Sequence, residues 1–159
     1  MIQRIQTLYL LAAVILMSLT LFLPLTTFVC GDEMVVLEAF GAKIDAAENA
    51  NMPLYLGVLL AMATALPLVT IFLYKRRMLQ IRLGGAEIAL LVGSIAFEAI
   101  YIYLTNASLV ELYAPAEGRV EINLGVAAFA PIAAIVFVVL AMRATLRDEL
   151  LVRSLDRIR

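Results

Sequence analysis

The chain alternates between four long apolar stretches and short segments that hold most of its charged residues. The apolar stretches run over residues 8–29, 52–74, 84–104 and 124–142. The hydrocarbon core of a bilayer is about 30 Å thick and needs roughly 20 apolar residues in a helix. Lipid offers no hydrogen-bond partners, so backbone N–H and C=O groups in the membrane must bond to each other in helices or closed barrels. Four passes cannot close a barrel. The pattern therefore predicts an all-α membrane protein, a four-helix transmembrane bundle forming a single domain over residues 1–159.

The positions of Lys and Arg predict the orientation of these helices. Ten of the twelve basic residues lie before the first stretch, between the second and third, or after the fourth. They are Arg4, then Lys75, Arg76, Arg77 and Arg82, and then Arg143, Arg147, Arg153, Arg157 and Arg159. Short loops rich in Lys and Arg stay in the cytoplasm, so both termini are predicted to be cytoplasmic. No small-x-small cleavage site follows the first stretch, which we therefore interpret as a retained helix.

The two outer connections carry strand-like patterns around turns. In the first, residues 34–40 and 42–44 flank Gly41, and in the second, residues 110–113 and 119–122 flank residues 115–118. Alternating apolar and polar residues around a turn are typical of a β-hairpin. Because a two-stranded hairpin is marginal alone, we expect the two outer loops to pair into a small sheet. Disordered polar loops are the alternative.

The tail, residues 143–159, predicts a continuation of the fourth helix beyond the membrane. Leucine, valine and isoleucine recur among its charges, and Glu149 and Arg153 have the favourable i,i+4 order. Five arginines against three acidic residues suit anionic lipid headgroups, which contribute about 1 kcal/mol per basic residue near the surface. The amphipathic cytoplasmic helix is therefore either a surface anchor or a docking site for a partner.

Composition supports a membrane protein and excludes some partners. Hydrophobic residues make up 64% of the chain and charged residues 16%, and the mean hydropathy is +1.01. Soluble domains average roughly 45–50% apolar and 25% charged residues. A net charge of −1 gives no overall positive field, so we expect no nucleic-acid partner.

Two acidic residues interrupt the third stretch and are the candidate intramembrane site. Glu87 and Glu98 are eleven residues apart, so they share one helix face with Ser94 between them. A charge among apolar neighbours costs several kcal/mol unless it is protonated, paired or hydrated.

Each of the two glutamates has a structural and a functional interpretation. Glu87 lies near the cytoplasmic end, where it could reach headgroups or pair with Arg143. For Glu98, the candidate partners are Tyr55, Asn123 and Thr20. A protonated, hydrogen-bonded carboxyl group is the structural interpretation of Glu98, and a proton- or cation-binding site is the functional one.

Residues that commonly carry chemistry are scarce. Histidine is absent, which removes imidazole bases and His-based metal or haem sites. No nucleotide-binding or serine-nucleophile motif occurs, and Gly84 and Gly85 are interpreted as a tight turn. We therefore predict no enzymatic activity, no catalytic residues, no metal and no cofactor. Cys30, the only cysteine, should lie at the outer end of the first helix and react there with an impermeant maleimide.

Three stretches resemble a known family. They are residues 1–11 (MIQRIQTLYLL), 71–83 (IFLYKRRMLQIRL) and 147–159 (RDELLVRSLDRIR). Together they resemble the domain of unknown function 4293 family, small four-helix membrane proteins of Bacteroidetes-type bacteria. The resemblance covers essentially the whole chain and implies a location in the bacterial inner membrane. It brings no established activity and no catalytic residues.

The leading functional hypothesis is a non-enzymatic structural, assembly or docking subunit. Positive-inside topology requires only Lys or Arg in the cytoplasmic segments. Uncharged polar residues that it does not require, such as Gln6 and Gln80, nevertheless lie beside the basic clusters. Such residues indicate that the cytoplasmic ends meet each other, a membrane or cytoplasmic protein, or a second copy. A small transporter or ion-coupled carrier that uses Glu98 is the alternative. A lipid-binding or lipid-modifying protein is a third class.

Overall fold

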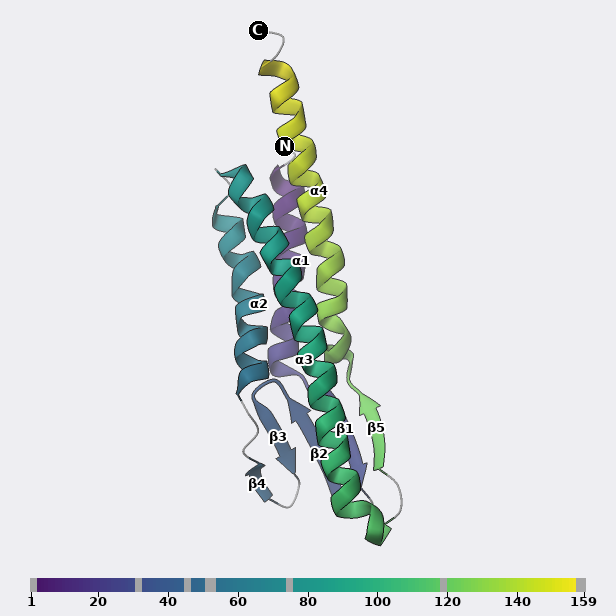
Figure 1. Ribbon diagram of the computed structural model, residues 1–159. Coiled ribbons are helices and arrows are strands. Elements are labelled where there is room, and N and C mark those ends of the chain that lie inside the picture. Colours follow the sequence, from purple (N-terminus) through teal and green to yellow (C-terminus); the bar gives the residue numbers. More distant parts are fainter. Residues whose placement is uncertain are drawn as a thin grey trace.

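The computed structural model describes residues 3–30, 33–44, 47–50, 54–73, 76–117 and 120–156. Side chains at 3–4, 44, 47–50, 77, 112–117 and 152–156 are outside that description. Four helices dominate the fold (Figure 1): α1 (Gln3–Phe22), α2 (Tyr55–Phe72), α3 (Arg77–Glu117) and α4 (Ala130–Asp156). A short 3-10 helix, η1 (Val126–Phe129), precedes α4.

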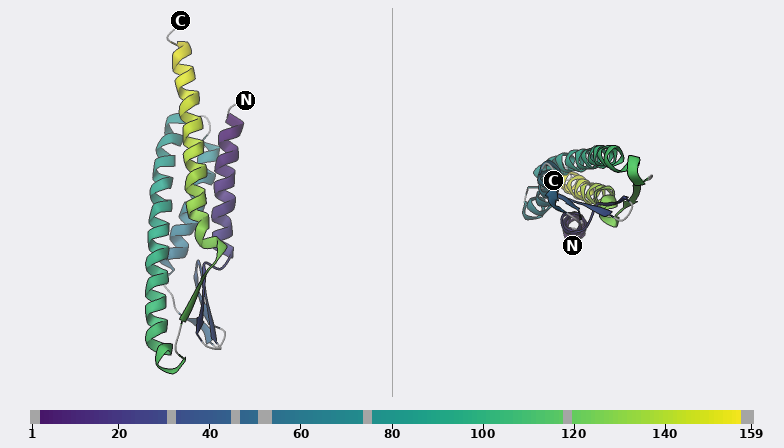
Figure 2. Two further views of the ribbon diagram at one scale, coloured as in Figure 1. Left: turned by 90° about the vertical axis from the view of Figure 1, so that its right-hand side faces the viewer. Right: turned by 90° about the horizontal axis from the view of Figure 1, so that it is seen from below.

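Each of the four helices is long and apolar enough to cross a membrane. The predicted class, a mostly helical protein with four membrane-length helices, is therefore confirmed. α1 packs against α2 and α4, and α3 packs against the same two helices. The first turn of α1 and the last turns of α4 point to one end of the molecule, and the strands lie at the other end (Figures 1 and 2).

The first helix is shorter than predicted. It ends at Phe22 rather than continuing to residue 29, and Thr26–Cys30 form strand β1. Pro24 has no backbone N–H and disfavours a helical conformation in the residue before it, and Thr26, Thr27 and Val29 are β-branched, which favours a strand. The 20 residues of α1 still span about 30 Å, so the helix is long enough to cross the hydrocarbon core without this segment.

The third helix is much longer than predicted. Instead of residues 84–104, α3 covers 41 residues and is continuous through Gly84 and Gly85, so the predicted tight turn there is wrong. Residues 110–113, predicted as a strand, are helical. At 1.5 Å per residue α3 is about 60 Å long, twice the thickness of the hydrocarbon core. An apolar layer of that thickness accommodates about half of α3.

The outer connections form one antiparallel sheet of five strands in the order β4-β3-β2-β1-β5. Besides β1, its strands are β2 (Glu33–Glu38), β3 (Gly41–Ile44), β4 (Ala47–Ala50) and β5 (Val120–Leu124). β2 and β3 make the predicted hairpin, although its turn is Ala39–Phe40 rather than Gly41. β5 pairs with β1 along its whole length. The expectation that the two loops share a sheet is confirmed, whereas the second hairpin is wrong because its first strand belongs to α3.

The second half of α3 covers one face of this sheet. Strands β1 and β2 alternate between buried and more exposed positions, which places Phe28, Val35 and Leu37 on the buried face. Leu109 of α3 belongs to the same apolar cluster, and Tyr101 packs against both this cluster and the core of the helical bundle. A small sheet needs an apolar face covered to be stable, and the extension of α3 provides that cover (Figure 2).

The fourth helix continues beyond its predicted membrane segment, as expected from the amphipathic pattern of the tail. The apolar stretch was expected from residue 124, but β5 and η1 come first and α4 begins at Ala130. The helix then runs without interruption through residue 142 to Asp156. The predicted helical continuation is thus confirmed as far as Asp156, and residues 157–159 lie outside the described part of the chain.

Candidate functional site

The predicted basic face is found at the end of the bundle opposite the sheet. Within the described side chains, Arg76 and Arg82 of the α3 region and Arg143 and Arg147 of α4 are exposed. The backbones of Arg4, Arg77 and Arg153 lie in α1, α3 and α4, but their side chains are not described. Lys75 and Arg157 lie outside the described residues. Four predicted members of the face can therefore be placed with their side chains.

A buried hydrogen bond joins α1 to α4 at this end. The Gln6 side-chain amide Nε2 donates to Asp148 Oδ2 at 3.1 Å, and both residues are buried. Gln6 lies in the first two turns of α1, and Asp148 lies near the end of α4. The expectation that polar residues of the basic segments meet each other is confirmed for this pair.

A second glutamine fixes the connection between α2 and α3. Gln80 Nε2 donates to the Thr70 carbonyl oxygen at 3.1 Å, and both residues are buried. Thr70 lies in the last turn of α2, and its carbonyl oxygen also accepts the backbone N–H of Leu73 at 3.2 Å. The Gln80 side chain is therefore a second donor to this oxygen, and it joins α3 to the end of α2.

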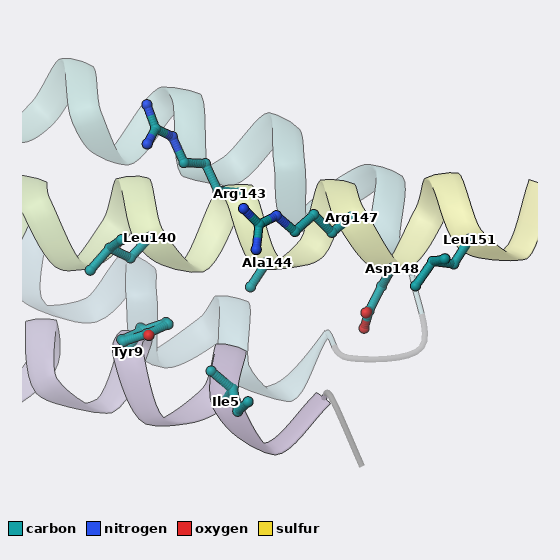
Figure 3. Close-up of a pocket in the computed structure, with 8 residues that line it drawn as sticks. All are labelled: Ile5, Tyr9, Leu140, Arg143, Ala144, Arg147, Asp148 and Leu151. Atoms are coloured by element: carbon teal, nitrogen blue, oxygen red, sulfur yellow. The ribbon is translucent and has the colours of Figure 1, made fainter.

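An open groove lies between α1 and α4 beside the Gln6–Asp148 bond. Its volume is about 420 Å³. Its apolar lining consists of Ile5 and Tyr9 from α1 and Leu140, Ala144 and Leu151 from α4. In Figure 3, Leu140, Ala144 and Leu151 project from α4 toward the helix that carries Ile5 and Tyr9. The groove is thus bounded by apolar side chains from both helices.

Three charged residues of α4 complete the lining of the groove: Arg143, Arg147 and Asp148. The Arg147 side chain folds back along α4 toward Ala144, whereas Arg143 points away from α1 (Figure 3). Neither arginine forms an ion pair among the residues whose side chains are described. Asp148 is 7% exposed, and its Oδ1 atom has no hydrogen-bond partner in that same part of the chain.

The candidate acidic site on α3 is buried. Glu87 is 0% exposed and Glu98 is 4% exposed. Neither oxygen of Glu87 has a hydrogen-bond partner among the described side chains, and neither does Oε1 of Glu98. Ser94, between them, is buried and donates to the Leu91 carbonyl oxygen at 2.8 Å.

The expected partners of the two glutamates do not bind them. The predicted ion pair between Glu87 and Arg143 is absent, because Glu87 is enclosed in the bundle and Arg143 is exposed. Thr20 bonds to the Leu16 carbonyl oxygen in its own helix, and Tyr55 is 74% exposed. Asn123 is exposed on β5. Glu87 is therefore enclosed within the bundle and is not on its surface, which contact with lipid headgroups would require.

Sequence reasoning missed the full extent of the polar face of α3. Gln80, Glu87, Ser94 and Tyr101 follow each other at seven-residue intervals, and the Tyr101 hydroxyl is buried without a partner among the described residues. A repeat of seven residues keeps side chains on one helix face. That spacing was the available signal, since three of the four residues lie within the predicted stretch 84–104 and only Gln80 precedes it.

Cys30 is buried in the apolar cluster between the sheet and α3. Its expected reactivity toward an impermeant reagent in the native protein is therefore wrong, whichever side of a membrane the sheet occupies. Among the described residues, no group of three or more His, Cys, Asp or Glu could hold a metal ion.

Comparison with known proteins gives one family match. A family model described as "Domain of unknown function (DUF4293)" matches residues 2–158. The match covers all four helices, the sheet and the groove. No curated protein matches the chain.

Proposed function

The chain belongs to the DUF4293 family, and we propose that it is a non-enzymatic assembly or docking subunit of the bacterial inner membrane. In this proposal both termini are cytoplasmic and the sheet lies on the outer side. The distribution of Lys and Arg supports that orientation, since the described members of the three basic segments lie at the end of the helices opposite the sheet.

The observation that carries the docking proposal is an exposed apolar patch beside an exposed arginine on α4. Leu146 and Leu150 are 43% and 65% exposed and lie one helical turn apart. Arg143 is three residues before Leu146, on the same face. We name Arg143, Leu146 and Leu150 the docking face.

The position of the docking face favours a cytoplasmic protein as its partner. α4 extends beyond the first residues of α1 and α3 (Figure 1), and Leu150 is two residues after Asp148, which meets Gln6 near the start of α1. Leucine side chains bury apolar area on a partner, and an unpaired arginine favours an acidic group nearby. The proposed partner is therefore a protein surface with an apolar patch and a carboxylate.

Co-purification from native membranes tests this proposal. The L146S/L150S variant should lose the partners that wild type retains after cross-linking and mild detergent extraction, and Arg143→Glu should also weaken their capture. Met34→Ser is the matched control, because Met34 is 44% exposed at the sheet end. Identical captured proteins in all four samples would exclude docking through this face. Capture of only a second copy would make the protein a homo-oligomer.

A proton- or cation-coupled carrier is the second candidate. Its support is the burial of Glu87 and Glu98 on one helix face with three carboxyl oxygens that no described protein group satisfies. A buried carboxyl group in a membrane protein is costly and is commonly found on ion pathways. Proton flux into vesicles containing the purified protein would test this role.

The carrier hypothesis predicts that Glu98→Gln abolishes flux while the protein is still inserted normally. Glu111→Gln is the matched control, because Glu111 is an exposed acidic residue on the same helix. Equal flux in wild type, Glu98→Gln and protein-free vesicles would remove the carrier hypothesis.

A further inference from the structure

The α1–α4 groove combines an apolar wall with three charged residues, Arg143, Arg147 and Asp148, of which Arg143 points away from α1 (Figure 3). Leu140 and Leu151 mark the extent of the wall on α4, and eleven residues of helix correspond to about 16 Å. Arg147 and Asp148 lie near the Leu151 end. A molecule that matches this lining has an apolar chain and a headgroup with both charges.

Asp148 provides the strongest indication of a ligand. Its Oδ2 atom accepts the Gln6 hydrogen bond, which fixes the orientation of the carboxylate. Oδ1 is buried in the groove lining without a donor among the described residues. Buried polar atoms in proteins nearly always have a hydrogen-bond partner, and a charged donor satisfies a carboxylate better than a neutral one.

Arg147 supplies the complementary positive charge. It is exposed, lines the same groove, and forms no ion pair within the described side chains. Guanidinium groups bind phosphate with paired hydrogen bonds. Figure 3 shows Arg147 and Asp148 on adjacent positions of α4, with the carboxylate directed toward the α1 side.

We propose that this groove binds one molecule of phosphatidylethanolamine. Its phosphate binds Arg147, its ammonium group donates to Asp148 Oδ1, and one acyl chain lies along the wall formed by Tyr9, Leu140 and Ala144. A zwitterionic headgroup matches the neighbouring opposite charges. An anionic headgroup without an ammonium group binds Arg147 through its phosphate but offers Asp148 at most a neutral hydroxyl donor.

The groove and the docking face share Arg143 but differ in their apolar residues. Ala144 and Leu151 line the groove, whereas Leu146 and Leu150 do not. The L146S/L150S variant therefore leaves the groove lining intact, and it tests docking separately from lipid binding.

Phosphatidylcholine is the decisive comparison lipid, because it has the same phosphate and net charge but no N–H donor. We expect the purified full-length protein, stripped of lipid in detergent, to bind dioleoyl-phosphatidylethanolamine about tenfold more tightly than dioleoyl-phosphatidylcholine. Native mass spectrometry at increasing lipid concentration measures both affinities. Dioleoyl-phosphatidylglycerol, added in parallel, measures binding of an anionic headgroup with hydroxyl donors.

Two variants separate the roles of the charges. Asp148→Asn keeps an acceptor for Gln6 and should reduce the affinity for phosphatidylethanolamine to that for phosphatidylcholine. Arg147→Gln changes an exposed residue and should weaken binding of all three lipids by about tenfold. The charge-matched controls are Glu121→Gln and Lys43→Gln, both at exposed positions of the sheet, and neither should change lipid affinity.

Several results would overturn the proposal. Equal affinity of wild type for phosphatidylethanolamine and phosphatidylcholine would show that Asp148 accepts no bond from the headgroup. Tightest binding of phosphatidylglycerol would replace the zwitterionic ligand with an anionic one. Unchanged affinities in Arg147→Gln, or a lipid-free dimer that excludes lipid, would place binding outside this groove.

Discussion

Gln6 and Asp148 are 142 residues apart in the chain, yet their side chains form a buried hydrogen bond. Positive-inside topology does not require a glutamine at position 6, so the sequence indicated that the Gln6 side chain contacts another segment. Its partner could not be named, because several polar residues of the tail were equally available. The packing of α1 against α4 determines the partner, because it places Asp148 opposite Gln6.

Removing this glutamine should destabilise the helical bundle. In Gln6→Leu, both Asp148 oxygens would be buried without a donor, so we expect the free energy of unfolding to fall by about 1–3 kcal/mol. Denaturant titration in mixed micelles measures this change. Ser18→Ala is the control, because Ser18 bonds only to the Val14 carbonyl oxygen of its own helix. A loss equal to that of the control would show that the interhelical bond contributes nothing.

Replacing Glu87 with an apolar residue should not destabilise the protein, in contrast to replacing Gln6. Both carboxyl oxygens are buried without a donor among the described residues, and an unsatisfied buried polar group is costly. Glu87→Leu, which is similar in size and apolar, should therefore keep or increase the apparent melting temperature in detergent. Glu87→Gln retains a polar group and is the comparison. A large fall for leucine but not for glutamine would mean that the polar group is satisfied in the native membrane protein.

At the scale of elements, α3 connects the two parts of the molecule. Its first half packs in the helical bundle, and its second half covers the sheet. The apolar half could be predicted from the sequence, because the thickness of the hydrocarbon core requires about 20 consecutive apolar residues. The end of the second half was harder to predict, because residues that pack on the sheet cluster, such as Tyr101 and Leu109, are widely spaced among polar residues there. Contact with the sheet gives that half its stability.

Glycine substitutions test where elements pack closely. A Cβ atom on Gly57 of α2 would lie 2.7 Å from the Ala39 carbonyl oxygen and also against the Phe40 ring, so Gly57→Ala should lower the free energy of unfolding by about 1–3 kcal/mol. A Cβ on Gly85 of α3 would meet no atom within 4 Å. Gly85→Ala should therefore raise the free energy of unfolding by about 0.5–1 kcal/mol.

Denaturant titration of both glycine variants measures these opposite effects. Gly84→Ala gives an intermediate case, because its new Cβ would approach only the flexible Met142 side chain. Equal effects of alanine at positions 57 and 85 would contradict the close packing of α2 against the β2–β3 turn.

For the whole molecule, burial of Cys30 changes the experiment that determines orientation. Labelling of the native cysteine would fail even in a sheet on the outer side, because the thiol is enclosed against α3. New cysteines are therefore needed at exposed positions, in a Cys30→Ala background. Glu121 of β5 and Arg76 at the start of α3 are both exposed and lie at opposite ends of the molecule.

The proposed orientation predicts opposite labelling at these two ends. In spheroplasts, an impermeant maleimide should react with Glu121→Cys directly and with Arg76→Cys only after the membrane is permeabilised. The Cys30→Ala protein alone should not react. Direct labelling of Arg76→Cys and protection of Glu121→Cys would reverse the orientation.

By itself, the sequence determined the number of membrane-length helices, the basic end, the pairing of the outer loops and the helical tail. These features depend on hydrophobic length, charge and short-range periodicity, which are properties of consecutive residues. The tertiary structure alone decided that residues 26–30 form a strand, that α3 continues to Glu117, that Glu87 is enclosed, and that Asp148 meets Gln6 beside a groove. Each of these depends on what lies opposite a residue in space, and contacts between distant segments decide that.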